Sequence, residues 1–286
     1  MPNVEIFGDS ISEYWVGENS KVSADKIFGV FQQEVTDFFS DNKDIHLGFA
    51  FGGSSIDQTN KDFRYSDIDS NVVLQEENLP TFITRLGQSA SILGTYFDSM
   101  APYPLLHSLV NVAGRIYRWD IFLFVPGEML PVDDPLRRLP IVVADDPQDI
   151  FKSLSFSRIN YDSGVEFEDF HLHLTDWLFY LWNKTIRNIP IGSDNVLLFN
   201  EALRKWFHIE EFYLTQEDIE SPENLAHFIS SVGVADKFRE SLPSQVEAIF
   251  NSLVIQEQSD LAEYRDKIML IDQALLLREG QTFLQE

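Results

Sequence analysis

Two short stretches of the sequence, Gly53-Ser54 and Asp67-Ile68-Asp69, carry groups that could act together on a phosphate. A glycine lets the backbone approach a ligand closely, and a serine in a turn offers its hydroxyl and its N–H to a phosphate oxygen. In a strand, residues 67 and 69 point to the same face, where two carboxylates repel one another unless a cation lies between them. Magnesium meets that need, because proteins hold it through one or two carboxylates together with substrate phosphates.

A third carboxylate, Asp120, stands in an apolar run between Trp119 and Ile121. An unpaired aspartate is costly to bury in such a strand, so Asp120 calls for a cation or a hydrogen-bond donor. It is therefore a candidate for the same site.

The elements before and around these carboxylates follow from the spacing of apolar residues. Steps of three and four over 23–40 predict a helix with Ser23 as its N-cap. The run 45–51 predicts a buried strand that ends at two glycines, and 67–74 predicts a second strand.

The elements that carry Asp120 are predicted in the same way. Residues 80–99 are expected to be mainly helical, with Pro80 in the first turn. The segment "LLHSLVNVAGRIYRWDIFLFV" predicts two strands about an Ala113-Gly114 turn. The order of helices and strands indicates a mixed sheet with helices packed on it.

The second half of the sequence has a different texture. Five prolines between 126 and 147 are typical of a connector. Beyond it, apolar spacing predicts amphipathic helices at 169–189, 195–214 and 261–279, with a weaker helical pair between 222 and 253. The sequence thus predicts an α+β protein, with a mixed sheet and flanking helices in residues 1–150 and a mainly α-helical domain in residues 151–286.

Gly53-Ser54, twelve intervening residues and then Asp67-Ile68-Asp69 resemble the signature of the nucleotidyltransferase superfamily. This superfamily includes DNA polymerase beta and the antibiotic-modifying adenylyltransferases, and it requires a third carboxylate on a neighbouring strand, which Asp120 supplies. The antibiotic branch joins its catalytic domain to a helical domain. The resemblance therefore implies a catalytic domain over residues 1–150 and a substrate-binding domain over 151–286.

The resemblance implies transfer of a nucleoside monophosphate, expected to be AMP from ATP, to a hydroxyl group with release of pyrophosphate. Asp67, Asp69 and Asp120 would be the catalytic and metal-binding residues, holding two Mg²⁺ ions. Removing Asp69 or Asp120 is then expected to abolish turnover and leave the fold intact.

Gly53 and Ser54 are assigned to the nucleoside triphosphate on the same basis. Lys61 and Arg64, in the loop between the glycine-serine turn and the aspartates, would add positive charge beside the triphosphate. Both also fit solvated loop cations, so the two interpretations of this pair stay open.

The charge and composition exclude several classes of partner. Asp and Glu number 46 against 21 Lys and Arg, so the formal charge is −25, and this surface repels nucleic acid polymers and anionic membranes. There is no cysteine for a disulfide, a thiolate nucleophile or a zinc site. With no apolar run long enough for a membrane span and no secretory pattern at the start, a cytoplasmic protein is expected.

The acceptor is expected to be a small cationic molecule. The run "VEFEDF" places Glu166, Glu168 and Asp169 near the junction of the predicted domains, where carboxylates could hold ammonium groups. Glu166 is a candidate general base for the acceptor hydroxyl, although an acidic run also suits a solvated helix entry. These features favour the branch that resembles aminoglycoside adenylyltransferases, with drug resistance as its implied role.

Two alternatives remain from the sequence. One is an adenylyltransferase whose acceptor is of the lincosamide type. The other is a non-catalytic relative that binds a nucleotide or a protein partner, as small antitoxins of this superfamily do. The three carboxylates favour an enzyme over such a binding module.

Overall fold

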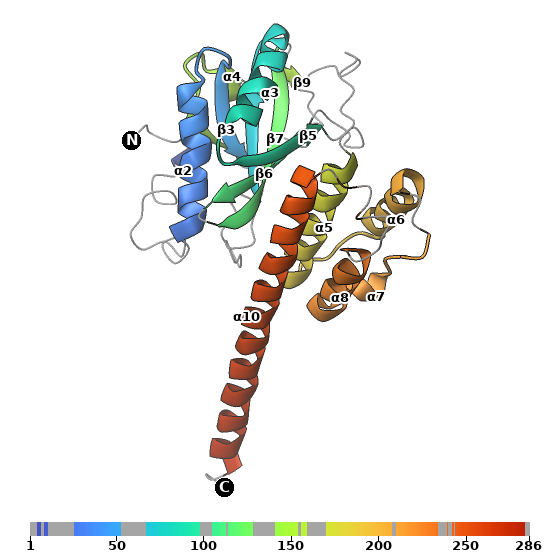
Figure 1. Ribbon diagram of the computed structural model, residues 1–286. Coiled ribbons are helices and arrows are strands. Elements are labelled where there is room, and N and C mark those ends of the chain that lie inside the picture. Colours follow the sequence, from blue (N-terminus) through green and yellow to red (C-terminus); the bar gives the residue numbers. More distant parts are fainter. Residues whose placement is uncertain are drawn as a thin grey trace. The chain divides into compact units, whose positions relative to one another are not determined.

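Figure 1 shows the computed structural model of the protein, in which the chain forms two compact units, Met1–Asp176 (unit 1) and Trp177–Glu286 (unit 2). The structure describes residues 5–6, 9–10, 26–52, 67–97, 105–112, 114–127, 141–153, 156–158, 170–207, 210–233, 239, 242 and 244–283. The proline-rich segment and the change in apolar spacing predicted a boundary near residue 150, whereas the compact units divide after Asp176. The roles of the two parts as catalytic and substrate-binding domains stay predictions.

Unit 1 is built on a mixed sheet, which in the described residues has nine strands in the order β2-β1-β8-β3-β4-β7-β6-β5, with β9 also paired to β7. The strands are β1 (Glu5–Ile6), β2 (Asp9–Ser10), β3 (Gly48–Gly52), β4 (Ile68–Val73), β5 (Ile92–Phe97), β6 (Leu105–Val112), β7 (Arg115–Pro126), β8 (Ile141–Asp145) and β9 (Phe156–Arg158). Strands β4 and β7 pair in parallel, and the other described pairs are antiparallel.

Two helices, α2 (Lys26–Asp41) and α3 (Leu79–Gln88), cover one face of this sheet (Figure 1). The ring of Phe39 in α2 stacks on Phe49 of β3 at 4.1 Å between centroids, and it meets Trp119 of β7 edge-on at 5.7 Å. Alternate residues of β7 point to this side, because successive side chains of a strand point to opposite faces. Trp119 therefore belongs to the helix face, and Asp120 belongs to the opposite one.

The opposite face of the sheet packs against helices of unit 1. Phe124 of β7 packs on Phe156 of β9, and Phe156 packs on Phe151 in the short helix α4 (Ile150–Ser153). The first turns of α5 (Phe170–Ile186) also belong to unit 1. A side chain at Gly94 of β5 would lie 2.5 Å from Leu172 of α5, so the glycine permits this close approach.

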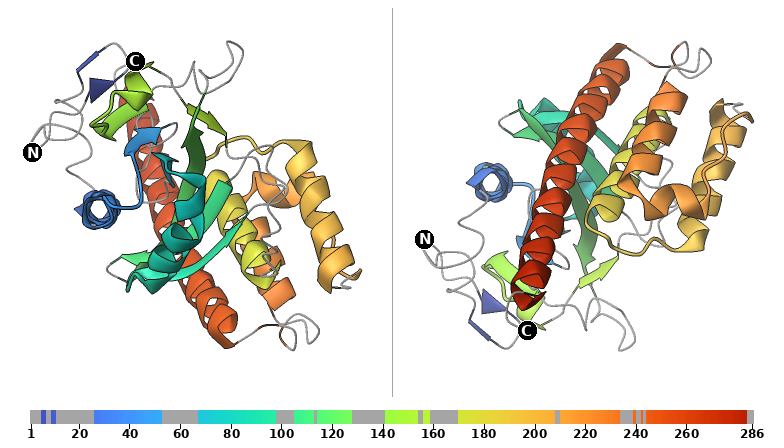
Figure 2. Two further views of the ribbon diagram at one scale, coloured as in Figure 1. Left: turned by 90° about the horizontal axis from the view of Figure 1, so that it is seen from above. Right: turned by 90° about the horizontal axis from the view of Figure 1, so that it is seen from below.

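Unit 2 consists of helices in the described residues. They are the rest of α5, then α6 (Ser193–Phe207), α7 (Gln216–Glu220), α8 (Pro222–Gly233) and α10 (Ser244–Phe283). Phe199 of α6 packs on Trp177 and Phe228, with centroid distances of 5.9 and 6.0 Å. Helix α10 has 40 residues. Figure 2 shows it as one continuous helix. No described helix is both long enough and apolar enough to cross a membrane.

The predicted α+β class is confirmed, and so are several elements. Strand β4 lies within the predicted 67–74, and the hairpin of β6 and β7 turns at Gly114, whose φ of +85° favours glycine. The helix predicted at 23–40 is found as α2, while Ser23 lies outside the described residues.

The prediction of a mainly helical segment over 80–99 was wrong. Helix α3 ends at Gln88, and residues 92–97 form β5, which pairs with β6. The sequence "ILGTYF" is rich in β-branched and aromatic residues, which favour a strand once a partner strand is available. The short apolar run that lies among the prolines of the predicted connector forms strand β8, which pairs with β3.

Candidate metal centre

The three predicted aspartates lie together at one end of the ladder that pairs β4 with β7. Asp67 directly precedes β4, Asp69 is the second residue of β4, and the parallel register places Asp120 of β7 opposite Asp69. One carboxylate oxygen from each of the three lies within 4.8 Å of the others. Neighbouring strands are about 4.8 Å apart, so residues in register on one face must bring their side chains together.

Burial makes this cluster unusual. Asp67 is 8% exposed and Asp120 is 6% exposed, while Asp69 is half-buried. Three carboxylates so close together repel one another, and burial strengthens the repulsion because water screens it less. The cluster therefore needs positive charge near it.

Part of that charge comes from two residues of the protein. Arg118 Nη1 lies 3.3 Å from Asp120 Oδ2, and His107 Nδ1 lies 2.7 Å from Asp120 Oδ1. Arg118 precedes Asp120 by two residues in β7, and His107 is its register partner in β6, so all three share one face. Arg118 Nη2 lies 2.8 Å from His107 Nδ1 and 3.1 Å from its Nε2. A guanidinium only donates, so the ring nitrogen without a proton accepts from it, and with the proton on Nδ1, facing Asp120, that nitrogen is Nε2.

The guanidinium of Arg118 also reaches the first turns of α5. Its Nε donates to Asp176 Oδ2 at 3.0 Å, and the hydroxyl of Tyr96 donates to the same oxygen at 2.6 Å. Burial acts to lower the pKa of Arg118, but the charges of Asp120 and Asp176 outweigh it and hold the pKa well above its ordinary value. Arg118 therefore stays cationic and joins two buried carboxylates.

The donor set of the cluster suits a hard divalent cation. All the converging atoms of Asp67, Asp69 and Asp120 are carboxylate oxygens, the ligands that Mg²⁺, Mn²⁺ and Ca²⁺ prefer. Asp120 Oδ1 bonds to His107 and Oδ2 forms an ion pair with Arg118, yet each oxygen has a further lone pair that can bind a metal. The buried acidic cluster thus fits a metal-dependent enzyme.

The other predicted site residues lie outside the described residues: Gly53, Ser54, Lys61, Arg64 and Glu166. The strand that leads to the glycine-serine turn is described. Gly52, the last residue of β3, pairs in register with Asp69. A Cβ at Gly52 would lie 2.5 Å from Asn71 Nδ2, so a larger residue there would require the Asn71 side chain to move.

Four residues of this site were not predicted: Tyr96, His107, Arg118 and Asp176. Arg118 carried a usable signal, since a cation two residues before a strand aspartate shares its face. His107 could be found only with the register of the hairpin. Tyr96 and Asp176 meet through the packing of α5 on β5, which no local pattern specifies.

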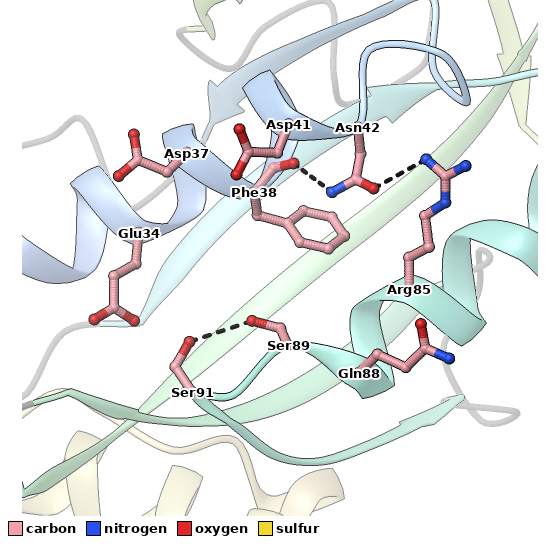
Figure 3. A pocket seen from close by; sticks show the side chains of 9 residues that line it. All are labelled: Glu34, Asp37, Phe38, Asp41, Asn42, Arg85, Gln88, Ser89 and Ser91. Atoms are coloured by element: carbon pink, nitrogen blue, oxygen red, sulfur yellow. Dashed lines mark hydrogen bonds between the residues drawn. The ribbon is translucent and has the colours of Figure 1, made fainter.

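A pocket of unit 1 lies on the helix face of the sheet and is separate from the aspartates. It has a volume of about 390 Å³ and is lined by Glu34, Asp37, Phe38, Asp41, Asn42, Arg85, Gln88, Ser89 and Ser91 (Figure 3). Arg85, the one cation among its described lining residues, is held by Asp44 through two hydrogen bonds of 2.6 and 2.8 Å. Three carboxylates and an occupied arginine do not favour a nucleoside triphosphate there.

No protein-family model and no curated protein matches the chain. A solved structure, that of the STING-associated CdnE c-di-GMP synthase from Capnocytophaga granulosa, is similar over 90% of this chain and 95% of the other. The sequence identity is 13% and the TM-score is 0.22. A TM-score this low does not establish a shared fold or function. The proposed function is therefore based on the geometry of the site.

Proposed function

We propose that the protein is a metal-dependent nucleotidyltransferase that transfers a nucleoside monophosphate, AMP from ATP, to a hydroxyl of a small molecule. The convergence of Asp67, Asp69 and Asp120 across the parallel β4–β7 pair is the observation that carries this proposal. Two carboxylates one residue apart on one strand and a third in register on the next form an oxygen cluster that suits two Mg²⁺ ions.

The residues of the chain divide the work of this reaction. Asp67, Asp69 and Asp120 hold the cations, which when bound supply Lewis acidity and offset the charge of the leaving pyrophosphate. Gly53 and Ser54 follow directly on β3 and bind the triphosphate through backbone N–H groups and a hydroxyl.

The chemical step joins the acceptor oxygen to the α-phosphorus of the nucleotide. The bond from that phosphorus to the bridging oxygen of pyrophosphate breaks, and pyrophosphate leaves. The proton of the acceptor hydroxyl passes to a base, for which Glu166 is our candidate.

The acceptor in this proposal is a small cationic, hydroxylated molecule of the aminoglycoside type. The formal charge of −25 and the acidic run that contains Glu166 support a cation over an anion. A lincosamide-type acceptor is the second choice.

One observation favours a second candidate function, a binding module without catalysis. Asp120 is already compensated by Arg118 and His107 within the protein, so part of the cluster is balanced without a metal ion. A nucleotide- or protein-binding relative could keep the carboxylates for that structural purpose alone.

The test is a pyrophosphate-release assay with Mg²⁺ and each of the four common nucleoside triphosphates. Each nucleotide is assayed alone, with aminoglycosides and with lincosamides, and Asp69→Ala serves as the inactive control. We expect release that needs an aminoglycoside, is fastest with ATP and is lost in the control. Nucleotide binding by calorimetry without release under any condition would instead support the binding module and overturn the enzyme.

A further inference from the structure

A buried chain of polar side chains runs from Tyr96 through Asp176 and Arg118 to Asp120. Asp176 is 0% exposed, and no described residue donates a hydrogen bond to its Oδ1. Burying an ion pair costs more desolvation than a well-packed apolar pair of the same size would. The pair of Arg118 and Asp176 therefore contributes little to stability by itself, and this points to a role in the candidate metal centre.

The geometry of Arg118 suggests what that role is. Its Nε lies 3.0 Å from Asp176 Oδ2, and its Nη1 lies 3.3 Å from Asp120 Oδ2. One positive charge is thus shared between two carboxylates. If Asp176 were neutral, the guanidinium would act more strongly on Asp120, and a metal ion would have to compete with it for the same oxygen.

We propose that Asp176 is a positioning residue for the metal centre, which acts by holding Arg118 partly away from Asp120. This inference rests on the proposed function, because it assumes that Asp67, Asp69 and Asp120 bind the cation. In this proposal a buried residue of α5 controls how tightly the carboxylates at β4 and β7 bind the metal ion. Tyr96 supports Asp176 by donating to the oxygen that Arg118 also uses.

The test measures Mn²⁺ binding to the full-length protein by electron paramagnetic resonance of the free ion. Asp176→Asn keeps the shape of the side chain and removes its charge. We expect the Kd for Mn²⁺ to rise about 10-fold, the lower end of the range found when the residues that orient metal ligands are changed.

A second substitution separates this role from a merely structural one. In Arg118→Met/Asp176→Asn the competing guanidinium is absent, so we expect the Kd to return to within about 3-fold of the wild-type value, well below the single-variant change. A structural defect would not be repaired by a second buried substitution. If Asp176→Asn does not fold, the double variant alone decides, because a Kd far above wild type in it overturns the inference.

Two controls complete the experiment. Thr95→Val removes a 2.8 Å hydrogen bond to Ser108 on the opposite face of β5, and it should leave the Kd unchanged. Asp69→Ala should abolish the site. If Asp69→Ala has no effect on Mn²⁺ binding, the metal centre and this inference both fall. If Asp69→Ala abolishes binding and Asp176→Asn leaves it unchanged, only this inference falls.

Discussion

Asp120 has two kinds of neighbour, repelling and attracting. On one side it faces Asp67 and Asp69, which repel it, and on the other it is bonded to Arg118 and His107. The sequence showed only the first side, from which we expected that either Asp69 or Asp120 could be removed without harm to the fold. The contacts with Arg118 and His107 change that expectation for Asp120, and for Asp69 it stays a prediction.

Asp69→Ala and Asp120→Ala are both predicted to lower turnover by about 10³-fold or more, because each removes a ligand that stabilises charge in the transition state. Their effects on stability should differ. Asp120→Ala leaves Arg118 with one buried partner fewer and should cost about 3 kcal/mol, whereas Asp69→Ala removes a half-buried carboxylate from a repelling cluster and should cost less. Urea unfolding of the two variants measures the difference.

Thr95→Val is the control for these measurements, since it changes the same sheet away from the aspartates. Wild-type turnover in either aspartate variant would remove that residue from the metal centre. Equal stability of the two variants would show that the bonds from Arg118 and His107 contribute little to the fold.

Single elements differ in how well their own residues specify them. The hairpin of β6 and β7 was predictable, because its turn is local and its strands alternate clearly. The end of α3 was not, because residues 92–97 become a strand by pairing with β6, which is distant in sequence. Strand propensity is expressed only where a partner strand and a face to pack on are present.

Helix α10 carries two buried carboxylates, Glu257 and Asp260, one turn apart. Two causes raise the pKa of Glu257 well above its ordinary 4.5: first its burial, and second the negative charge of Asp260. Asp260 Oδ2 accepts a hydrogen bond of 3.2 Å from the indole of Trp182. The helix therefore contains a carboxyl group that prefers to keep its proton.

Glu257→Gln is predicted to stabilise the protein at neutral pH. The folded state binds the Glu257 proton more tightly than the unfolded chain does, so its stabilising contribution is present below pH 4.5 and is lost as the pH rises through the folded pKa. Glutamine keeps the neutral shape at every pH. We expect the Tm of the variant to exceed that of wild type by a few degrees at pH 8, because each kcal/mol of added stability raises Tm by about 2–4 °C. The two Tm values should converge near pH 4.

Asp266→Asn, which changes an exposed carboxylate of the same helix, is the matched control for net charge. A gain in Tm that is the same in both variants would assign the effect to the overall charge. A gain that does not shrink as the pH falls would contradict the linkage to Glu257.

At the scale of the whole molecule, the formal charge of −25 sets the field that any ligand meets. A field of this sign raises the local concentration of small cations and slows the approach of polyanions. It acts over the Debye length, which falls from about 10 Å at 0.1 M salt to about 3 Å at 1 M.

For an aminoglycoside that supports turnover, we therefore predict that KM rises several-fold between about 0.1 M and about 1 M salt, with little change in kcat. An uncharged hydroxylated acceptor should show no such rise, and the pair of acceptors separates the field from a general effect of salt. A KM for the cationic acceptor that does not depend on salt would mean that local contacts decide its binding.

The sequence alone determined which residues share a face. Asp67 with Asp69, and Arg118 with Asp120, are two positions apart, and the twofold period of a strand is a local property of the backbone. It also determined the α+β class, since apolar spacing differs between the two halves of the chain. Tertiary structure decided the rest: the parallel pairing that sets Asp120 beside Asp69, the strand at 92–97 and the approach of Asp176 to Arg118. These depend on the burial of surfaces far apart in the chain, which no local period encodes.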